Sequence, residues 1–168
     1  MTVLSLTVRD AREGDLLQSL AMHNHVVATS TAHYNAHPAD LADRRALVAG
    51  RQAAGLPFIV AAEGDAVAGY ASFGPFRPQD GFAASVEHMI YVAPAFQRRG
   101  VAGLLMSALE ARARALGIHV MLGAIDAENA PSVALHERHG FVRVGLMPQA
   151  ARKFDRWLDL LWMQKTLD

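Results

Sequence analysis

The chain has 168 residues, of which 52% are hydrophobic, with 16 basic and 16 acidic side chains and no cysteine. This length predicts a single domain over 1–168, and the apolar content excludes a disordered chain. The zero net charge argues against a nucleic-acid-binding protein, and the lack of cysteine excludes disulfides, thiol nucleophiles and thiolate metal sites. No signal-peptide pattern or bilayer-length apolar run is present, which predicts a cytoplasmic protein that does not contact membranes.

The first half of the chain predicts strands and helices in short blocks. A weak apolar alternation opens the chain, and an amphipathic helical pattern starts at Leu16. A second helical pattern lies between Pro38 and Gly55, and two short apolar runs then flank a Gly-Asp turn, as in a β-hairpin. The predicted elements are a strand over 3–8, a helix from Leu16, a helix over 39–54, and strands over 58–62 and 67–73.

The second half alternates strands and helices more regularly, after a Gly- and Pro-rich loop over 74–81. Asn129 is suited to cap a helix that Gly140 ends. This order predicts an α+β or mixed α/β domain built on a single sheet. The predicted elements are strands over 85–92, 119–125, 141–145 and 157–165, and helices over 101–116 and 129–140.

One loop carries the pattern of an anion-binding site. A predicted strand runs through Q-R-R-G-V-A-G at 97–103 directly into an amphipathic helix. The first N–H groups of a helix lack internal partners, and Gly100 permits close approach, so these groups can bind a diphosphate. Arg98 and Arg99 would add charge-assisted contacts. The spacing fits neither the dinucleotide fingerprint nor the P-loop, and on spacing alone an ordinary helix start beside a basic loop is an equal alternative.

The same loop resembles the Q/R-x-x-G-x-G/A signature of the GNAT superfamily of acyl-CoA N-acyltransferases, with Ala102 at its last position. The segments 85–92 and 129–141 resemble two further motifs of that superfamily, in the same order. Within it, the chain is similar to the phosphinothricin and methionine sulfoximine/sulfone N-acetyltransferase branch. The branch resemblance is carried by NHVVATSTAHYN at 24–35, GYASFGPFRP at 69–78 and MPQAARKFDRWLD at 147–159.

The resemblance implies the GNAT fold, a central, mostly antiparallel sheet flanked by helices and splayed at an acyl-CoA cleft. It also implies acetyl-CoA as co-substrate, whereas the spacing of the histidines and the lack of cysteine predict no metal. The strand before the loop would lie against the pantetheine and acetyl group, and the loop would hold the diphosphate. The implied cofactor-binding residues are Ile90, Tyr91, Val92, Gln97, Arg98, Arg99, Gly100, Val101, Ala102, Gly103, Asn129, Ser132 and His136.

Two residues are predicted to be catalytic, Glu87 and His136. Direct transfer needs a neutral amine, and an α-ammonium with a pKa of about 8 is mostly protonated at neutral pH. Glu87 can take that proton, directly or through a water, while its neighbour His88 points to the opposite face of the strand. The alternative for Glu87 is a solvent-facing carboxylate. His136 is read equally as a proton donor to the CoA thiolate, a cofactor contact or a structural histidine.

The acceptor side is predicted from the branch resemblance. Arg77, between two prolines, suits a substrate carboxylate, and its alternative is a surface arginine. Around Lys153 the chain lacks the glycines usual in the branch, and His23 and His25 also depart from it, so the acceptor pocket differs from the branch pattern. The implied substrate-binding residues are Thr29, Thr31, Tyr34, Phe76, Arg77, Glu87, His88 and Lys153.

The sequence thus predicts an N-acetyltransferase for the α-amino group of a small amino acid or analogue, with a detoxifying role. The candidate acceptors are methionine sulfone, methionine sulfoximine and phosphinothricin. The alternatives are another amine, such as a peptide N-terminus, polyamine or aminoglycoside, or a CoA-binding regulatory module without turnover. The histidine pairs His23/His25 and His136/His139 have no third ligand at metal-binding spacing. A homodimer is predicted because apolar side chains crowd the C-terminal segment, at Phe154, Trp157, Leu158, Leu160, Leu161 and Trp162.

Overall fold

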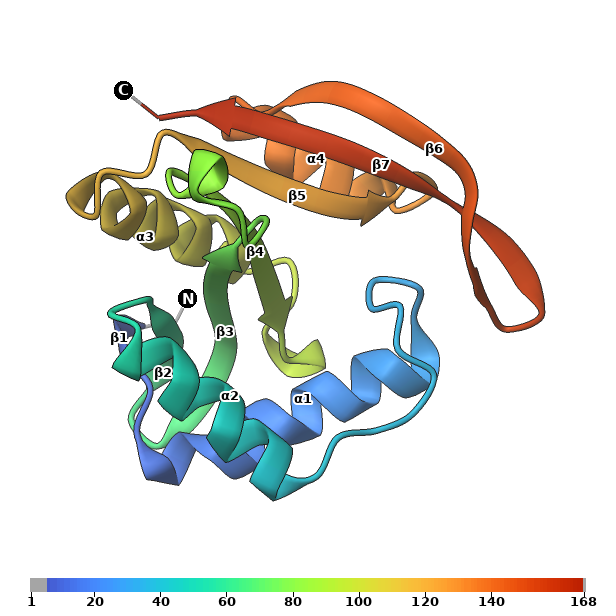
Figure 1. Ribbon diagram of the computed structural model, residues 1–168. Helices are drawn as coiled ribbons and strands as arrows, with labels where there is room; N and C mark the ends of the chain where they lie inside the picture. The colour runs from blue at the N-terminus through green and yellow to red at the C-terminus, as the bar shows by residue number, and fades with distance from the viewer. Residues whose placement is uncertain (1–5, 168) are drawn as a thin grey trace.

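The computed structural model describes residues 6–167 and contains a seven-stranded sheet with the order β1-β2-β3-β4-β5-β7-β6 (Figure 1). All neighbouring strands are antiparallel except β4 and β5, which confirms the predicted mixed α/β class with a mostly antiparallel sheet. The strands are β1 (Thr7–Asp10), β2 (Phe58–Glu63), β3 (Ala66–Pro75), β4 (Ser85–Val92), β5 (Val120–Asp126), β6 (Val142–Lys153) and β7 (Arg156–Thr166).

Helices cover both faces of the sheet. Figure 1 shows α1 and α2 packed together below the β1–β4 half, with α3 and α4 on the other side. Helix α3 lies between β4 and β5 in the chain, which explains the one parallel pair. A crossover helix carries the chain back to the same end of the sheet, so the next strand runs in the same direction. The helices are α1 (Leu16–Thr29), α2 (Leu41–Ala53), α3 (Val101–Ala115) and α4 (Ala130–Arg138).

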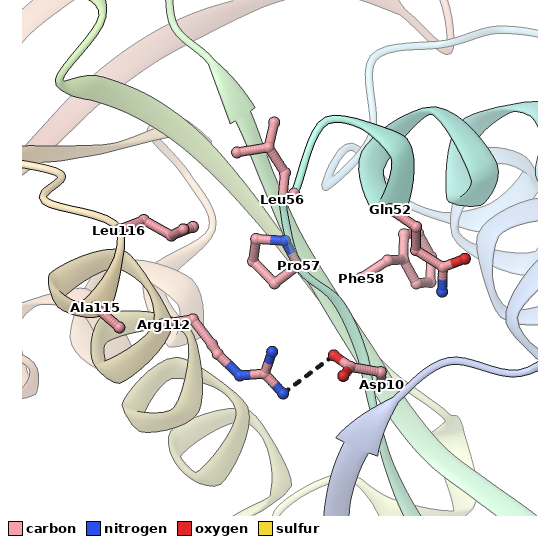
Figure 2. Close-up of a pocket in the computed structure, with 9 residues that line it drawn as sticks. Asp10, Gln52, Leu56, Pro57, Phe58, Arg112, Ala115 and Leu116 are labelled. Carbon is pink, nitrogen blue, oxygen red and sulfur yellow. Dashed lines mark ion pairs between the residues drawn. The ribbon is translucent and has the colours of Figure 1, made fainter.

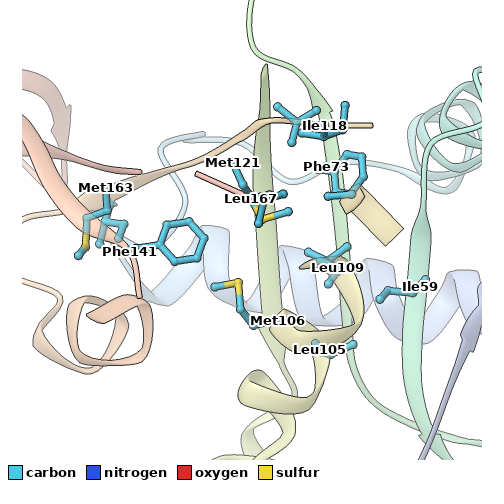
Figure 3. Packing of buried hydrophobic residues seen from close by; sticks show 14 of the residues in the cluster. Ile59, Phe73, Leu105, Met106, Leu109, Ile118, Met121, Phe141, Met163 and Leu167 are labelled. Atoms are coloured by element: carbon cyan, nitrogen blue, oxygen red, sulfur yellow. The ribbon is translucent and has the colours of Figure 1, made fainter. Parts of the chain in front are cut away.

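The core has two layers, one on each face of the sheet. Strand β2 shows the division, because Ile59 joins the cluster under α3 whereas Phe58 and Val60 join the cluster under α1 and α2. In the α3 layer, Leu105 and Met106 are fully buried against the strands (Figure 3). The two layers hold β4 and the start of α3 in place, and these elements carry the predicted cofactor residues.

Local signals explain the helix ends. Asp40 caps α2, accepting a hydrogen bond from the Asp43 backbone N–H at 2.8 Å, so the helix begins two residues later than predicted. Asn129 caps α4 through the Ser132 N–H at 3.2 Å, as predicted, and Pro131 lies in the tolerated first turn.

Two predicted strand boundaries are wrong. The strand predicted over 3–8 is found at 7–10, and its positions 3–5 lie outside the described residues. The strand predicted to end at residue 145 continues to Lys153, past Pro148. Because β6 is an edge strand, it can accept a proline, and its pairing with β7 is irregular between Met147 and Ala151.

No helix within residues 6–167 is both long enough and apolar enough to cross a membrane.

Candidate active site

The central feature of the site is a separation of β4 from β5. The two strands pair only from Ser85 to Glu87, opposite Val120 to Leu122. Beyond that point β4 stays in unbroken register with β3, and β5 stays paired with β7. Residues 88–92 of β4 and residues 123–126 of β5 therefore do not pair with each other, and the backbone groups on these facing edges lack a strand partner. An extended ligand can use such backbone groups, as an added strand does.

The loop that enters α3 lies at the end of β4 and fits a phosphate group. Gly100 is the N-cap of α3 with φ of 82°, so no side chain caps the first turn. Arg98 also has a positive φ, 59°, and the guanidinium of Arg99 lies 5.3 Å from the ring centre of Phe96. Free N–H groups at a helix start beside two exposed arginines suit a diphosphate.

A glycine in β3 brings this helix start close to the cleft. A Cβ on Gly69 would lie 2.7 Å from the carbonyl oxygen of Tyr91, and 3.1–3.2 Å from the side chains of Leu105 and Val101. Gly69 thus permits the first turns of α3 to pack directly over β3 and β4. A larger residue here would push the loop 97–100 and the start of α3 away from the strand edge.

Glu87 stands at the point where β4 and β5 part. Alternation along β4 places it on the face of Met89 and Tyr91, toward α1 and α2. The side chain is half-buried, and burial raises the pKa of Glu87, an effect that the positive charge of Arg77 opposes. A carboxylate with a raised pKa in a cleft is suited to exchange protons.

Tyr34 lies in the loop between α1 and α2, within the electrostatic reach of Asp126 and Glu87. Its hydroxyl is buried and has no hydrogen-bond partner among the described residues. Burial, followed by the charges of Asp126 and then Glu87, raises the pKa of Tyr34 to about 12. The hydroxyl is therefore protonated at neutral pH and free to bond a polar ligand group near Glu87.

The loop between α1 and α2 is tied to the rest of the site by polar contacts. Thr31 donates its hydroxyl to the Asp126 carboxylate at the end of β5. The Lys153 ammonium, from the β6–β7 hairpin that curves toward this loop in Figure 1, donates to the carbonyls of Ser30 and His33, each at 2.6 Å. Thr29 instead donates to the His25 carbonyl of its own helix, at 2.7 Å.

Phe76 and Arg77 follow β3 directly. The ring of Phe76 lies edge-on to Trp162 of β7, with 5.7 Å between ring centres. The exposed guanidinium of Arg77 stacks 5.1 Å from the Phe76 ring centre. Phe76 thus anchors the loop, and its neighbour Arg77 remains available to a ligand beside Glu87.

His88 and His136 meet on the other face of the sheet. Their Nε2 atoms are 3.1 Å apart. The Nδ1 atom of His88 lies 2.9 Å from the Leu122 carbonyl oxygen, and that of His136 lies 2.7 Å from the Ser132 carbonyl oxygen. Burial lowers the pKa of His136, and burial together with the neighbouring His136 lowers the pKa of His88 to about 3. The structure thus places His88 away from Glu87, at the side of α4.

Among the buried charged residues that sequence reasoning missed, two lie beside residues of the predicted site. Asp126 is 2% exposed, and only its place at the end of a predicted strand could have signalled it. Arg44 is also 2% exposed, with its guanidinium 5.0 Å from the ring centre of Tyr70. It belongs to a polar helical stretch that predicts a solvated face, so no local signal marks it. Arg44 borders a cavity of about 340 Å³ that reaches Met89, His23 and His33.

A second cavity, of about 460 Å³, lies elsewhere (Figure 2). It opens between β1, β2 and the end of α3, where Arg112 pairs with Asp10 at 3.1 Å. Neither the strand separation nor any predicted site residue borders it. Within residues 6–167, no three histidine or acidic side chains gather as a metal site would require.

Comparison with known proteins agrees with this geometry. The pattern of the Acetyltransferase (GNAT) family matches residues 19–141. An L-methionine sulfoximine/L-methionine sulfone acetyltransferase of Pseudomonas paraeruginosa is 46% identical over 98% of this chain and 96% of its own. A phosphinothricin N-acetyltransferase of Alcaligenes faecalis is 34% identical over 96% and 83%.

A solved structure shows the same fold. The yncA protein of Salmonella typhimurium, determined with its cofactor acetyl-CoA, is 42% identical over 98% of this chain and 95% of its own, with a TM-score of 0.95. The chain therefore belongs to the Acetyltransferase (GNAT) family, and it is an N-acetyltransferase with the GNAT fold. The family resemblance seen in the sequence is confirmed.

Proposed function

We propose that this enzyme acetylates the α-amino group of a small amino acid analogue such as methionine sulfone, methionine sulfoximine or phosphinothricin. The observation that carries the proposal is the parting of β4 from β5 directly after Glu87, between a phosphate-binding loop and an acceptor-side loop. The names of the relatives support the acceptor class. In this role the enzyme would act in the cytoplasm and detoxify such analogues.

In this proposal one group of residues beside the separated strands binds acetyl-CoA, and another group binds the acceptor. Acetyl-CoA supplies the acetyl group, and the free edge of 90–92, the loop 97–103 and the Asn129–Ser132 turn are suited to hold it. On the acceptor side, Arg77 pairs with the carboxylate and Tyr34 bonds a polar group. Catalysis then depends on positioning and on proton removal, without an acyl-enzyme, because the chain has no cysteine.

Two residues move protons in this proposal. Glu87 accepts the proton of the substrate ammonium, directly or through a water, so that the amine can attack the acetyl carbon. His136 donates a proton to the departing sulfur. The two groups lie on opposite faces of the sheet. In this proposal Glu87 takes a proton from the amine on one face, and His136 gives a proton to the sulfur on the other.

A thiol-release assay tests the proposal. Acetyl-CoA is supplied with methionine sulfone, methionine sulfoximine, phosphinothricin, a polyamine, an aminoglycoside and a peptide with a free N-terminus. We expect the three amino acid analogues to give the highest kcat/KM. Preferential turnover of the polyamine or the peptide would overturn the proposed acceptor class, and binding of acetyl-CoA without turnover of any amine would favour a regulatory module.

Arg77→Ala should weaken the preference for a carboxylate. A hydrogen bond to a charged group contributes about 1.5–3 kcal/mol, and Arg77 is exposed, so we expect the lower end, about tenfold in kcat/KM. The measurement compares L-methionine sulfone with its amide for both proteins. The wild type should prefer the acid, and the variant should lose most of that preference with an unchanged KM for acetyl-CoA. Equal slowing with both acceptors would show that Arg77 only supports the loop.

We further propose that the protein is a homodimer. Leu158 and Leu161, expected at the surface, are buried in the core, so they do not support the prediction. The edge strand β6 and its hairpin instead expose large apolar side chains, which a partner would cover. These are Val142, Val144, Leu146, Met147, Phe154 and Trp157, each 49–61% exposed.

Light scattering at micromolar concentration should give the mass of two chains. Val144→Lys with Leu146→Lys should yield a monomer, because both changes place charge on the exposed face of β6. A wild-type mass of one chain would contradict the dimer.

A further inference from the structure

The contact between His88 and His136 restricts how many hydrogens the four ring nitrogens of the pair can carry. Both Nδ1 atoms face backbone carbonyl oxygens, those of Leu122 at 2.9 Å and Ser132 at 2.7 Å. A carbonyl oxygen only accepts, so each Nδ1 must carry a hydrogen for these contacts to be favourable. The two Nε2 atoms then face each other at 3.1 Å. If both rings were neutral, two lone pairs would meet at hydrogen-bond distance.

The contact is favourable only with one hydrogen between the two Nε2 atoms. Three hydrogens on two imidazole rings give one positive charge. With only two hydrogens on the two rings, at least one of the three contacts, to Leu122, between the rings or to Ser132, has lone pairs on both of its atoms. The chain of four polar groups, from the Leu122 carbonyl to the Ser132 carbonyl, is therefore complete only in the singly charged state.

We propose that His88 and His136 hold one shared proton at neutral pH, and that this proton is the one delivered to the departing sulfur. The second part rests on the proposed function. His136 is then the catalytic acid, and His88 is a positioning residue that stabilises its charged form. When the carbon–sulfur bond breaks and the sulfur keeps the electron pair, the shared proton moves to the sulfur. The pair is left neutral, with two lone pairs opposed, and regains a proton from water.

The residues around the pair leave room for both rings and hold their orientation. A Cβ on Gly123 of β5 would lie 2.8 Å from Nε2 of His136 and 2.9 Å from Cε1 of His88, so only glycine leaves room for both rings. The Phe141 ring stacks on His88, with 5.5 Å between centres and 19° between planes, and meets His136 edge-on. These contacts fix both ring orientations at the point where β4 leaves β5.

The charges around the pair act in both directions. Burial and His139 disfavour charge on His136, but His139 is itself paired with Glu110 of α3 at 3.2 Å, and Lys165 of β7 shares that carboxylate at 2.7 Å. His136 lies in the last turn of α4, where the helix dipole favours a cation. On β4, Glu87 points to the opposite face, and the β5 neighbours Leu122 and Gly123 present a carbonyl and no side-chain charge.

Burial lowers the pKa of both histidines, whereas the hydrogen-bond geometry of the pair favours one shared charge. Two interacting groups titrate in two steps that belong to the pair. Burial, and after it the charge of His136, lowers the pKa of His88 to about 3, so the pair does not take up a second proton at neutral pH. The first proton is lost as the pH rises through the pKa of the pair, which burial lowers and which the shared hydrogen bond would raise.

Nuclear magnetic resonance of the protein labelled with ¹⁵N-histidine tests the charge without any substrate. At pH 7 we expect both Nδ1 atoms of the pair to be protonated and one further proton, shifted downfield, to couple to the Nε2 atoms. His88→Phe keeps a ring against Phe141 but removes the acceptor, so His136 should become neutral at pH 7. His119→Phe, an exposed position between α3 and β5 outside the predicted site, is the matched control and should leave the signals of the pair unchanged. Two neutral rings in the wild type at pH 7 would overturn the proposal.

Kinetics test the second part. His88→Phe should lower kcat at least tenfold and change its pH profile, with little effect on the KM for acetyl-CoA, whereas His119→Phe should behave as wild type. An unchanged kcat and pH profile in His88→Phe would overturn the positioning role. If the resonance result is as expected but no amine is acetylated by the wild type, the proposed function fails while the shared proton stands, so the two failures are distinguishable.

Discussion

Glu87→Gln should lower kcat about 10²-fold or more, because the amide keeps the shape of the side chain and cannot accept a proton. In the wild type, activity rises with pH as Glu87 and the substrate amine lose protons, and burial places the pKa of Glu87 above that of an ordinary carboxyl. In the variant, the part of this rise in activity with pH that is due to deprotonation of Glu87 should be absent. Its rate should then follow only the fraction of amine that is neutral in solution.

The stability of this variant separates a lost base from a damaged fold. A carboxyl whose pKa is raised in the folded state stabilises the protein below its unfolded-state pKa, and that stability is lost as the pH rises through the folded pKa. At pH 7 the wild type therefore carries a destabilising charge, and Glu87→Gln should have an equal or higher Tm. Glu63→Gln, at the end of β2, is the control with normal activity. A near-normal rate and pH profile in Glu87→Gln would remove Glu87 from the mechanism.

Reversing the charge of both Arg98 and Arg99 to Glu should raise the KM for acetyl-CoA about 10²-fold. Each lost charge-assisted contact is worth about 1.5 kcal/mol at the lower end of its range, and two such contacts multiply. The backbone N–H groups at the start of α3 remain, so some binding should persist. Initial rates at varied acetyl-CoA and saturating acceptor measure the effect.

The matched control has the same change in net charge. Arg45→Glu with Arg112→Glu reverses two arginines that pair with acidic residues, on α2 and near the far end of α3 from the loop. This double variant should keep the wild-type KM for acetyl-CoA. An unchanged KM in the Arg98 and Arg99 variant, or an equal rise in the control, would remove the loop from cofactor binding.

Most elements of the fold could be predicted because local signals and burial agree. Strand β4 was predicted with its observed bounds, and α3 and α4 to within two residues, since apolar spacing, Asn129 and the closing glycines mark them. The end of β6 could not be predicted, because Pro148 locally indicates a break. Only the position of β6 at the sheet edge makes that proline acceptable, and sheet order is not a local property.

The site shows the same division. The loop 97–103 was visible in the sequence because a glycine N-cap and two arginines are contiguous there. The pairing of His88 with His136 joins residues 48 positions apart, and it depends on Gly123, whose role appears only when the strands are placed. Asp126 ends an apolar strand and Arg44 lies in a polar helix, and the burial of both follows from packing across elements. Positions whose role depends on such packing carry no local pattern.

The most direct test of the central claim is the product of one reaction. The wild type is incubated with acetyl-CoA and L-methionine sulfone, and free thiol and acetylated products are measured together by absorbance and mass spectrometry. Direct transfer predicts N-acetyl-methionine sulfone in amounts equal to the released thiol, with no acetyl group on the protein. Thiol release without this product, or acetyl groups retained on the protein, would contradict the account.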